Sequence, residues 1–548
     1  MNESVTGGEQ IVATLKAAGV EVVFGIISIH NIPIYDAISR MGGIRVIPTR
    51  SEPGAVNMAD GYARATGKLG VAITSTGAGA GNGAGALVEA QTAGTPLLHL
   101  TGQIDSTHVD QGKGFIHECK DQLGMLKAIS KEAYRLRSRQ ALPSLLSTAI
   151  EKAFAAPGGV VSIELPIDLQ KAKAPSAEVS ITPPVPRWPD PERINEAVRF
   201  LQNAKRPLIW AGSGVIAANA SAELQELAEL LGAGVLTSQA GRGSITEDHP
   251  LCIGNFGNNP ALRPFLEQAD LLLAVGTRFR GQETMQWTLP LPATQIQVDA
   301  DPLAIGRSYP ATLGVVGDAK LVLRELINRM KDQAQPNPSY MEEVEQARNA
   351  VRKALRSTLG PYEQLQDDLR AAMQRDALLV RDVTISGTTW GSRLFPIYGP
   401  RQTIHAAGGG IGQGWQMALG AKLGQPERQV VALLGDGGFL VNCGEMATAA
   451  QENIAVVGLL FNDGGYGVLR NIQNKNYEGR NIAVDLRSPD FSQLAAGFGL
   501  GYSKVASVTS FKPVLEEALA ANRPYLIEVD MAAIGPFAVP FAGPANSI

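Results

Sequence analysis

The residue types best suited to chemistry in this chain stand at the ends of two apolar runs. Asp436 ends the run QVVALLGD, Asn462 ends the run IAVVGLLFN, and glycines follow both. A carboxylate oxygen, an amide oxygen and a backbone carbonyl, here that of Gly464, are hard ligands of the kind that Mg²⁺ prefers. Mg²⁺ fills its remaining positions with phosphate oxygens and water. We therefore predict that Asp436, Asn462 and the Gly464 carbonyl bind a magnesium ion.

The elements around these residues must bring them together. Both apolar runs are predicted to be β-strands, and residues 445–450 between them are predicted to form a helix. Parallel strands joined by a crossover helix place both C-terminal ends at one edge of a sheet. Glycines in the turns let backbone N–H groups approach phosphates closely. These glycines are Gly437, Gly438, Gly464 and Gly465. The segment is thus predicted to be a magnesium-bridged diphosphate site; the alternative is two ordinary strand–turn units.

The pattern GDGG followed by Asn462 resembles the diphosphate motif of the thiamine diphosphate (ThDP) enzymes. The resemblance extends over nearly the whole chain. It lies within the branch of acetolactate synthase, benzoylformate decarboxylase and benzaldehyde lyase. It implies ThDP and Mg²⁺ as cofactors.

Three α/β segments are separated by proline-containing stretches. Helix-like and strand-like stretches alternate along residues 1–172, 192–330 and 345–548, which indicates parallel sheets. The stretches between them are predicted to be linkers. The fold class is therefore α/β with three domains. The resemblance implies that these are, in order, a pyrimidine-binding, a central and a diphosphate-binding domain.

Composition excludes several classes of protein. A chain of 548 residues is too long for one core. A net charge of −4 gives no electrostatic case for binding nucleic acid or an anionic membrane. The start, MNESVTGGEQ, lacks the features of a signal peptide, and the apolar runs are too short to span a bilayer. Three widely spaced cysteines indicate no disulfide framework. We expect a cytoplasmic protein.

Glu52 is predicted to be the catalytic acid. It follows the strand-like run IRVIP and precedes the helix-like stretch GAVNMADGYARA. A carboxyl group at a strand end beside an apolar cleft can donate a hydrogen bond near neutral pH. The stretch resembles the motif RHEQGA…ADGYAR, whose glutamate bonds the aminopyrimidine ring of ThDP and promotes its imino tautomer. Ser51 and Pro53 depart from that motif. The alternative is a surface glutamate that caps the helix.

The stretch HAAGGGIGQGWQMALGAKLG resembles the segment that holds the aminopyrimidine ring. The resemblance implies that Ile411 bends the cofactor and that the Gly409 carbonyl accepts a hydrogen bond from its 4′-amino group. Such a bend places the amino nitrogen beside the reactive carbon. Ser386 resembles the hydroxyl that joins the diphosphate shell. Without the resemblance, Ile411 would be read as core and Ser386 as part of a turn.

The segment FGIISIHNIPIYDAI resembles a loop that lines the active site of the family. Relatives such as benzaldehyde lyase carry a histidine at the position of His30, which implies a catalytic role. Ser28 and Ile29 replace the usual glycine pair and are expected to shape the substrate pocket. The alternative for His30 is a structural histidine.

The stretch HECKDQLGMLKAISK resembles a second segment of the active site. Gln122 matches an active-site glutamine of the same relatives, and His117 lies in the same loop. Both are assigned as catalytic residues. His405, at the start of the pyrimidine-binding stretch, is assigned to the substrate pocket. A structural role is the alternative for each of them.

The middle segment contains Gly212-Ser213-Gly214 after a strand-like run. This is weak evidence for a dinucleotide, because the third glycine of the fingerprint is absent. Some relatives bind FAD or ADP in this domain and others bind nothing. FAD is an alternative here, and we favour a structural domain.

The resemblance implies carbon–carbon bond chemistry. An acetolactate synthase-like carboligase would decarboxylate a 2-oxo acid to an enamine on the cofactor and add it to a second carbonyl. The alternative is a 2-oxo acid decarboxylase, or a hydroxyketone lyase like benzaldehyde lyase, that releases an aldehyde. Partners are then small 2-oxo acids or aldehydes. Active sites at subunit interfaces imply a homodimer or homotetramer. A nicotinamide-dependent oxidoreductase would leave Glu52, Asp436 and Asn462 unexplained.

Overall fold

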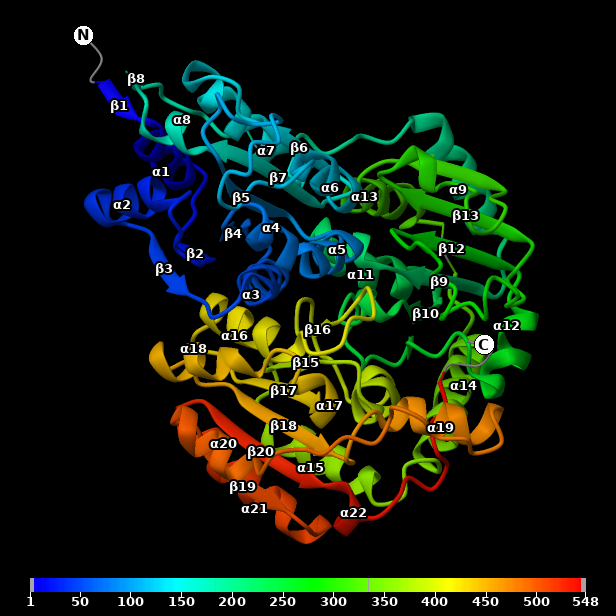
Figure 1. The fold of residues 1–548 in the computed structure, drawn as a ribbon. Helices are drawn as coiled ribbons and strands as arrows, with labels where there is room; N and C mark the ends of the chain where they lie inside the picture. The colour runs from blue at the N-terminus through cyan, green and yellow to red at the C-terminus, as the bar shows by residue number, and fades with distance from the viewer. Residues whose placement is uncertain (1–3, 183, 334, 544–548) are drawn as a thin grey trace.

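The computed structural model describes residues 4–182, 184–333 and 335–543. The first three and last five residues of the expected domain ranges lie outside this part of the chain. Three parallel sheets of six strands each form three α/β units, coloured blue to cyan, green, and yellow to red in Figure 1. This confirms the predicted fold class. Among the described residues, no helix combines the length and apolar composition that crossing a membrane requires.

The first sheet has the strand order β3-β2-β4-β5-β7-β6. Its inner strands are buried along their whole length, as expected for a parallel sheet covered by helices on both faces. A two-stranded antiparallel pair, β1 with β8, extends the unit to Pro175. The elements are β1 Ser4–Thr6, α1 Gly7–Ala17, β2 Val22–Gly25, α2 Ile32–Met41, β3 Arg45–Pro48, α3 Glu52–Thr66, β4 Gly70–Thr74, α4 Ala78–Asn82, α5 Ala84–Ala93, β5 Leu97–Gln103, α6 Gln122–Ile129, β6 Glu132–Arg135, α7 Leu142–Phe154, β7 Val160–Pro166, α8 Ile167–Lys171 and β8 Lys173–Pro175.

The central sheet has the order β11-β10-β9-β12-β13-β14. The direction of the strand order changes between β9 and β12, so the crevice beyond these two strands is where such sheets bind ligands. The elements are α9 Pro191–Asn203, β9 Pro207–Ala211, α10 Ser213–Ala217, α11 Ser221–Leu231, β10 Gly234–Thr237, β11 Cys252–Gly254, α12 Arg263–Gln268, β12 Leu271–Val275, β13 Thr294–Asp299, β14 Leu313–Val316 and α13 Ala319–Met330.

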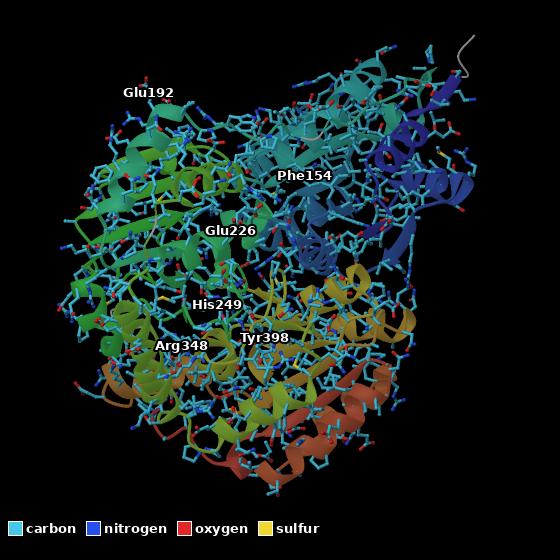
Figure 2. The ribbon with its side chains drawn as sticks, turned by 180° about the vertical axis from the view of Figure 1, so that it is seen from behind. Phe154, Glu192, Glu226, His249, Arg348 and Tyr398 are labelled. Carbon is cyan, nitrogen blue, oxygen red and sulfur yellow. The ribbon has the colours of Figure 1, made fainter. Side chains whose placement is uncertain are left out.

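The long helix α14 (Pro338–Arg356) packs against the central unit, although we expected the third domain to begin within it, near residue 345. The buried Tyr340 donates its hydroxyl to the Pro207 carbonyl (2.9 Å). Arg348 donates Nη1 to the His249 carbonyl (3.0 Å), and both residues are labelled in the rear view of Figure 2. The helix is therefore a connector that belongs with the central domain by packing.

The third sheet has the order β16-β15-β17-β18-β20-β19. Strands β17 and β18 are neighbours and parallel, as predicted from their apolar runs. The elements are α15 Tyr362–Ala372, β15 Leu378–Arg381, β16 Thr403–His405, α16 Gly414–Gly424, β17 Val430–Gly435, α17 Asp436–Phe439, α18 Met446–Gln451, β18 Val457–Asn462, α19 Gly467–Asn476, α20 Phe491–Phe498, β19 Gly501–Val505, α21 Val508–Ala520, β20 Tyr525–Asp530 and α22 Met531–Ile534.

Helices α3 and α16 join the first and third units, and Figure 1 shows them one above the other. A side chain at Gly61 would overlap the Met417 carbonyl, and one at Gly420 would overlap the Met58 carbonyl. The helix backbones therefore touch at these glycines. Side chains from both helices enter one shared apolar core. This contact fixes the motif that begins α3 relative to the motif that begins α16.

Candidate functional site

Asp436 and Asn462 meet at one edge of the third sheet, as their positions after parallel strands predict. Gly435 and Phe461, the residues before them, are paired across β17 and β18. Asp436 is buried, and its Oδ2 accepts a hydrogen bond from the Ser488 hydroxyl (3.0 Å). Asn462 donates Nδ2 to Glu528 Oε1 (2.9 Å). That bond uses the amide nitrogen, whereas the Asn462 Oδ1 accepts a hydrogen bond from the Gly464 amide (3.2 Å) and keeps a second lone pair for a cation.

The charges at this edge fit a divalent cation. Burial raises the pKa of Asp436. Burial and the neighbouring Asp436 carboxylate raise the pKa of Asp463 to about 6. Two crowded, desolvated carboxylates are stabilised when a cation lies between them. Within residues 4–182, 184–333 and 335–543, no group of three or more His, Cys, Asp or Glu side chains could hold a metal, so this mixed oxygen set is the candidate.

The third expected ligand, the Gly464 carbonyl, already has two donors. The Leu486 amide (2.9 Å) and Nη2 of Arg470 (3.2 Å) both donate to it. Binding of a cation to this oxygen would have to displace Arg470 or share the oxygen with it. The role of Gly464 as a ligand therefore stays a prediction.

The turns after β17 and β18 contain two glycines, Gly437 and Gly465, where a side chain would clash with its surroundings. A Cβ at Gly437 would lie 2.8 Å from the Tyr466 ring, and one at Gly465 would overlap the Val484 carbonyl. Gly464 and Gly465 have φ of 76° and 149°, which side chains rarely tolerate. Gly438 is buried beside Ile411. The absence of side chains at these glycines allows a phosphate to approach the backbone closely.

Two buried polar atoms near this edge lack partners. The hydroxyl of Ser386 is fully buried and has no hydrogen-bond partner in the part of the chain that the structure describes. The same holds for Oε1 of Gln413, whose amide lies against Gly410. Leaving buried polar groups unpaired is costly. A diphosphate and an aminopyrimidine would satisfy such groups, so the residues present fit ThDP.

The loop between β16 and α16 carries Gly409 and Ile411. Asp382, which sequence reasoning missed, accepts the amides of Gly412 and Gly414 (3.1 Å each) and so anchors the end of this loop. Gly409 has a φ of 84°. The Ile411 side chain remains 37% exposed. An isoleucine that packs on no core is available to contact a ligand.

Glu52 is the first residue of α3, but it does not cap the helix. The cap is Ser51, whose hydroxyl accepts the Gly54 amide (3.0 Å). The Glu52 carboxylate is partly exposed and accepts a hydrogen bond from Asn82 (3.3 Å). A Cβ at Gly79 would lie 2.7 Å from its Oε1. All these neighbours belong to the first domain, and the carboxylate keeps room for another donor.

The rings of His30 and His117 lie next to each other at an interplanar angle of 54°. Their Nδ1 atoms are 3.3 Å apart and their ring centroids are 5.2 Å apart. Burial, and then the charge of His117, lower the pKa of His30. Ile29 is 54% exposed, whereas the Ser28 amide is tied to the Asn31 side chain (2.7 Å). The pair and Ile29 can therefore contact a small ligand.

Gln122 is fully buried, and this limits its role. Its Oε1 accepts the Thr76 hydroxyl (2.9 Å) and the Gly77 amide (2.6 Å), and its Nε2 donates to the Gly102 carbonyl (3.3 Å). The side chain thus has no open face for a substrate. It positions the turn at Gly77. A Cβ at Gly77 would overlap the His117 carbonyl, so the backbone of His117 lies against this turn.

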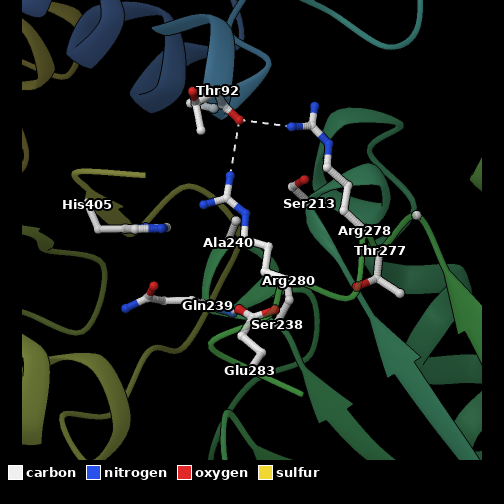
Figure 3. A pocket seen from close by; sticks show the side chains of 12 residues that line it. Thr92, Ser213, Ser238, Gln239, Ala240, Thr277, Arg278, Arg280, Glu283 and His405 are labelled. Atoms are coloured by element: carbon white, nitrogen blue, oxygen red, sulfur yellow. Dashed lines mark hydrogen bonds between the residues drawn. The ribbon is translucent and has the colours of Figure 1, made fainter. Parts of the chain in front are cut away.

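His405, which the sequence assigns to the substrate pocket, lies next to the central domain. It lines a cavity of about 20 Å³ together with residues of the central domain, including Ser213, Thr277, Arg278, Arg280 and Glu283 (Figure 3). Burial and nearby arginines lower the pKa of His405 well below its usual value. The role of His405 in the substrate pocket therefore stays a prediction.

The same cavity tests the alternative of a dinucleotide. It lies beyond β9 and β12, where Gly214 donates its amide to the Gly276 carbonyl (3.0 Å) and joins the two loops. Arg278 and Arg280 cross the remaining space to the Thr92 carbonyl (Figure 3). A space of about 20 Å³ holds one water-sized molecule. This cavity therefore gives no support for FAD, which stays the alternative that we do not favour.

Comparisons with known proteins agree with the geometry. Models of the N-terminal, central and C-terminal domains of thiamine pyrophosphate enzymes match residues 5–125, 194–326 and 386–529. A probable acetolactate synthase large subunit of Methanococcus aeolicus is 31% identical over 96% of this chain and 92% of the relative. An acetolactate synthase of Mycobacterium avium is 32% identical, over 96% and 87%. A probable 2-ketoarginine decarboxylase, AruI, of Pseudomonas aeruginosa is 32% identical, over 96% and 94%.

Proposed function

Since the chain belongs to the thiamine pyrophosphate enzyme family, we propose that it is a ThDP- and Mg²⁺-dependent carboligase like acetolactate synthase. The observation that carries the proposal is the meeting of Asp436 and Asn462 at one sheet edge, between glycine turns that a side chain would fill. The proposed reaction joins two 2-oxo acids, releases one CO₂ and gives a 2-hydroxy-3-oxo acid.

Each part of the site has a separate task. Asp436 and Asn462 would hold Mg²⁺, with the Gly464 carbonyl as the proposed third ligand, and the glycine turns and Ser386 would bind the diphosphate. ThDP supplies a nucleophilic carbon and an electron sink. Glu52 would hold a proton at the ring nitrogen of the aminopyrimidine. Ile411 would support the bend of the cofactor.

His30 and His117 are proposed to handle protons at the substrate. Because the pKa of His30 is lowered, its neutral form dominates near pH 7 and can accept a proton. His117 lies within hydrogen-bond distance of it and can share that proton. Gln122 would act indirectly, by holding the turn below this pair.

The site is proposed to be completed by a second copy of the chain. The neighbours of Glu52 are all in the first domain, whereas the magnesium edge is in the third. Both domains expose large apolar side chains near these residues, among them Ile27, Ile116, Ile411 and Val441. Such exposure marks interaction surfaces. A homodimer, or a tetramer of two dimers, would cover them and join Glu52 to the partner's cofactor.

The alternative function is a 2-oxo acid decarboxylase that releases an aldehyde. The similarity to the probable 2-ketoarginine decarboxylase AruI favours this candidate. The two functions differ in whether the site excludes proton donors before the second carbonyl arrives. Release of an aldehyde by a hydroxyketone lyase remains a third candidate.

Product analysis separates these functions. The purified protein, loaded with ThDP and Mg²⁺, is incubated with a panel of 2-oxo acids that includes pyruvate and 2-ketoarginine, with and without an added aldehyde. A carboligase gives a hydroxy-oxo acid or a 2-hydroxy ketone together with CO₂. A free aldehyde as the sole product from every substrate would replace the proposal with the decarboxylase.

A further inference from the structure

One side chain of the first domain holds the loop that carries Gly409. Glu89, on α5, is buried and accepts two consecutive amides of this loop, those of Ala407 and Gly408. The bond from Gly408 to Oε2 is 2.7 Å long. Hydrogen bonds from backbone amides to a charged carboxylate are among the stronger ones in proteins. One carboxylate therefore fixes the orientation of two successive peptide groups.

Arg280 of the central domain holds the same loop from the opposite side. Its Nη1 donates to the Ala407 carbonyl (2.6 Å), and its Nη2 donates to the Thr92 carbonyl at the end of α5 (3.1 Å). Figure 3 shows the guanidinium reaching Thr92 beside Arg278, which donates to the same carbonyl (3.0 Å). Ala407 is thus held through its N–H by the first domain and through its C=O by the central domain.

A third contact precedes these two. Arg64, on α3, donates Nη2 to the His405 carbonyl (2.8 Å) and pairs with Asp60 through Nη1 (3.1 Å). Burial raises the pKa of Glu89, and the positive charge of Arg64 acts against this effect. The start of the loop is therefore fixed at successive peptide groups from 405 to 408 by side chains of two other domains.

The other end of the loop is fixed by Asp382, which accepts the amides of Gly412 and Gly414. Between the two carboxylates, the Gly409 amide donates to the Ala406 carbonyl (3.3 Å), which continues the anchoring of the loop up to residue 409. A Cβ at Gly409 would meet no atom within 4 Å, so the loop projects into open space at this point. The direction of the Gly409 carbonyl follows from the peptides before it, which Glu89 and Arg280 hold.

We propose that Glu89 and Arg280 are positioning residues that aim the Gly409 carbonyl at the 4′-amino group of ThDP. The inference rests on the proposed function and on the role that the family resemblance implies for this carbonyl, namely to accept that hydrogen bond. It gives the central domain a part in cofactor activation that does not require a bound nucleotide. Small misplacements of reacting groups cost large factors in rate, so the clamp acts on rate more than on folding.

The first test uses the cofactor-free protein and does not depend on activity. Hydrogen–deuterium exchange is measured for peptides that cover residues 405–411 in the parent, Glu89→Gln, Glu89→Ala and Arg280→Ala. Exchange should be fastest in Glu89→Ala and intermediate in Glu89→Gln, which keeps one acceptor oxygen. The control is Glu226→Gln, at an exposed position of α11. Parent-like exchange in both Glu89→Ala and Arg280→Ala would overturn the clamp.

The second test measures activation at saturating ThDP and Mg²⁺. Exchange of the C2 proton of the bound cofactor should slow by about tenfold or more in Glu89→Gln and in Arg280→Ala, as expected for misplaced groups. Arg280→Lys should recover part of the rate, because the ammonium can reach one of the two carbonyls. A purely structural role would weaken binding but leave the saturated rate unchanged, and that result would overturn the inference.

The two levels of failure are distinguishable. If the proposed function is wrong, the parent protein itself will not retain ThDP or accelerate C2 exchange. If only the positioning role is wrong, the parent will do both, and Glu89→Gln will match it at saturation. Two independent variants from different domains guard against a single substitution that fails to fold.

Discussion

Ser51 donates both its amide and its hydroxyl to the Glu445 carboxylate, each at 2.9 Å from Oε1. Ser51 begins α3 in the first domain, and Glu445 precedes α18 in the third. Ser51, which departs from the family motif and directly precedes Glu52, is therefore bonded to another domain. This contact sets the starting point of α3 and, with it, the place of the Glu52 carboxylate.

Replacing Glu52 with glutamine should slow activation of the cofactor. Glutamine has nearly the same shape but cannot hold and release a proton. We expect Glu52→Gln to fold and bind Mg²⁺, and to bind ThDP more weakly. Its C2 proton exchange should slow by about 100-fold, within the range for general acid–base groups. Glu226→Gln is the control. Parent-like exchange with the cofactor bound would falsify the assignment of Glu52.

Replacing Asp436 with alanine should abolish retention of the cofactor. The substitution removes a side-chain oxygen from the proposed Mg²⁺ site, which has few protein ligands. Treating the parent with a chelator should release ThDP and activity together, and adding both Mg²⁺ and ThDP should restore them. Ser488→Ala, which removes only a hydrogen bond to Asp436, should keep most of the affinity. Stoichiometric ThDP in purified Asp436→Ala protein would contradict the site.

Mixing two inactive variants should restore activity if the site is shared between chains. Glu52→Gln and Asp436→Ala chains, mixed in equal amounts and allowed to exchange subunits, form heterodimers with one intact site. Random pairing in a closed dimer would give about a quarter of the parental activity. Each variant exchanged with itself is the control. A fully active monomer, seen by sedimentation at the assay concentration, argues against this arrangement.

Removing His117 should move the acid limb of the pH–rate profile to higher pH. Burial and the charge of His117 both lower the pKa of His30. His30 thus stays neutral as the pH falls to a value below its ordinary pKa. His117→Ala removes this charge and part of the burial of His30, so the pKa of His30 should rise. His30 should then become protonated at a higher pH, and the rate should begin to fall at a higher pH. The control is His108→Ala, in the same loop. An acid limb that does not shift in His117→Ala would contradict the coupling between His117 and His30.

Acid should destabilise the first domain through His99. Burial lowers the pKa of His99 to about 3, while its ring bonds Thr74 and Ser162. The pKa of this histidine in the unfolded chain is near 6.5. Below that pH the unfolded chain binds a proton that the native chain excludes, so the free energy of unfolding falls as the pH falls. From pH 7 to pH 5 the loss from this group is about 2 kcal/mol.

Urea unfolding at both pH values measures this contribution. His99→Gln should lower the stability at pH 7 but lose less of it on acidification than the parent does. His108→Gln provides the comparison at a loop position. An equal loss between pH 7 and pH 5 in the parent and in His99→Gln would show that His99 is not the group responsible.

Sequence reasoning succeeded where backbone geometry alone decides the result. Asp436 and Asn462 each follow an apolar strand, and parallel strands end at one edge whatever their side chains are. The same reasoning correctly predicted that a strand ends just before Glu52 and that a helix follows. No knowledge of packing was needed for these results.

Local sequence patterns say less about which neighbours a side chain contacts. Gln122 begins α6 next to the loop with His117, yet its side chain turns into the interior to hold Gly77. His405 ends a strand of the third sheet, yet it faces the central domain, which no local pattern reveals. Both outcomes depend on contacts between segments far apart in the sequence.

Two acidic residues were missed although the sequence held a signal for them. Asp382 follows the apolar run of β15, as Asp436 follows that of β17. Glu89 is the only charged residue of α5. A lone charge in an apolar helix is rarely buried without a partner. Here its partners are the backbone amides of a loop more than three hundred positions away, as the bond between Gly408 and Glu89 shows.

The glycine contact between α3 and α16 has a consequence for recombining such enzymes. The two helices meet backbone to backbone at Gly61 and Gly420, so neither surface tolerates a partner with a different spacing of small residues. A chimaera that imports the C-terminal third from a relative would have to import α3 as well. The unit of exchange is therefore the helix pair with its attached loops. A chimaera boundary placed at the linkers would take α3 from one parent protein and α16 from the other.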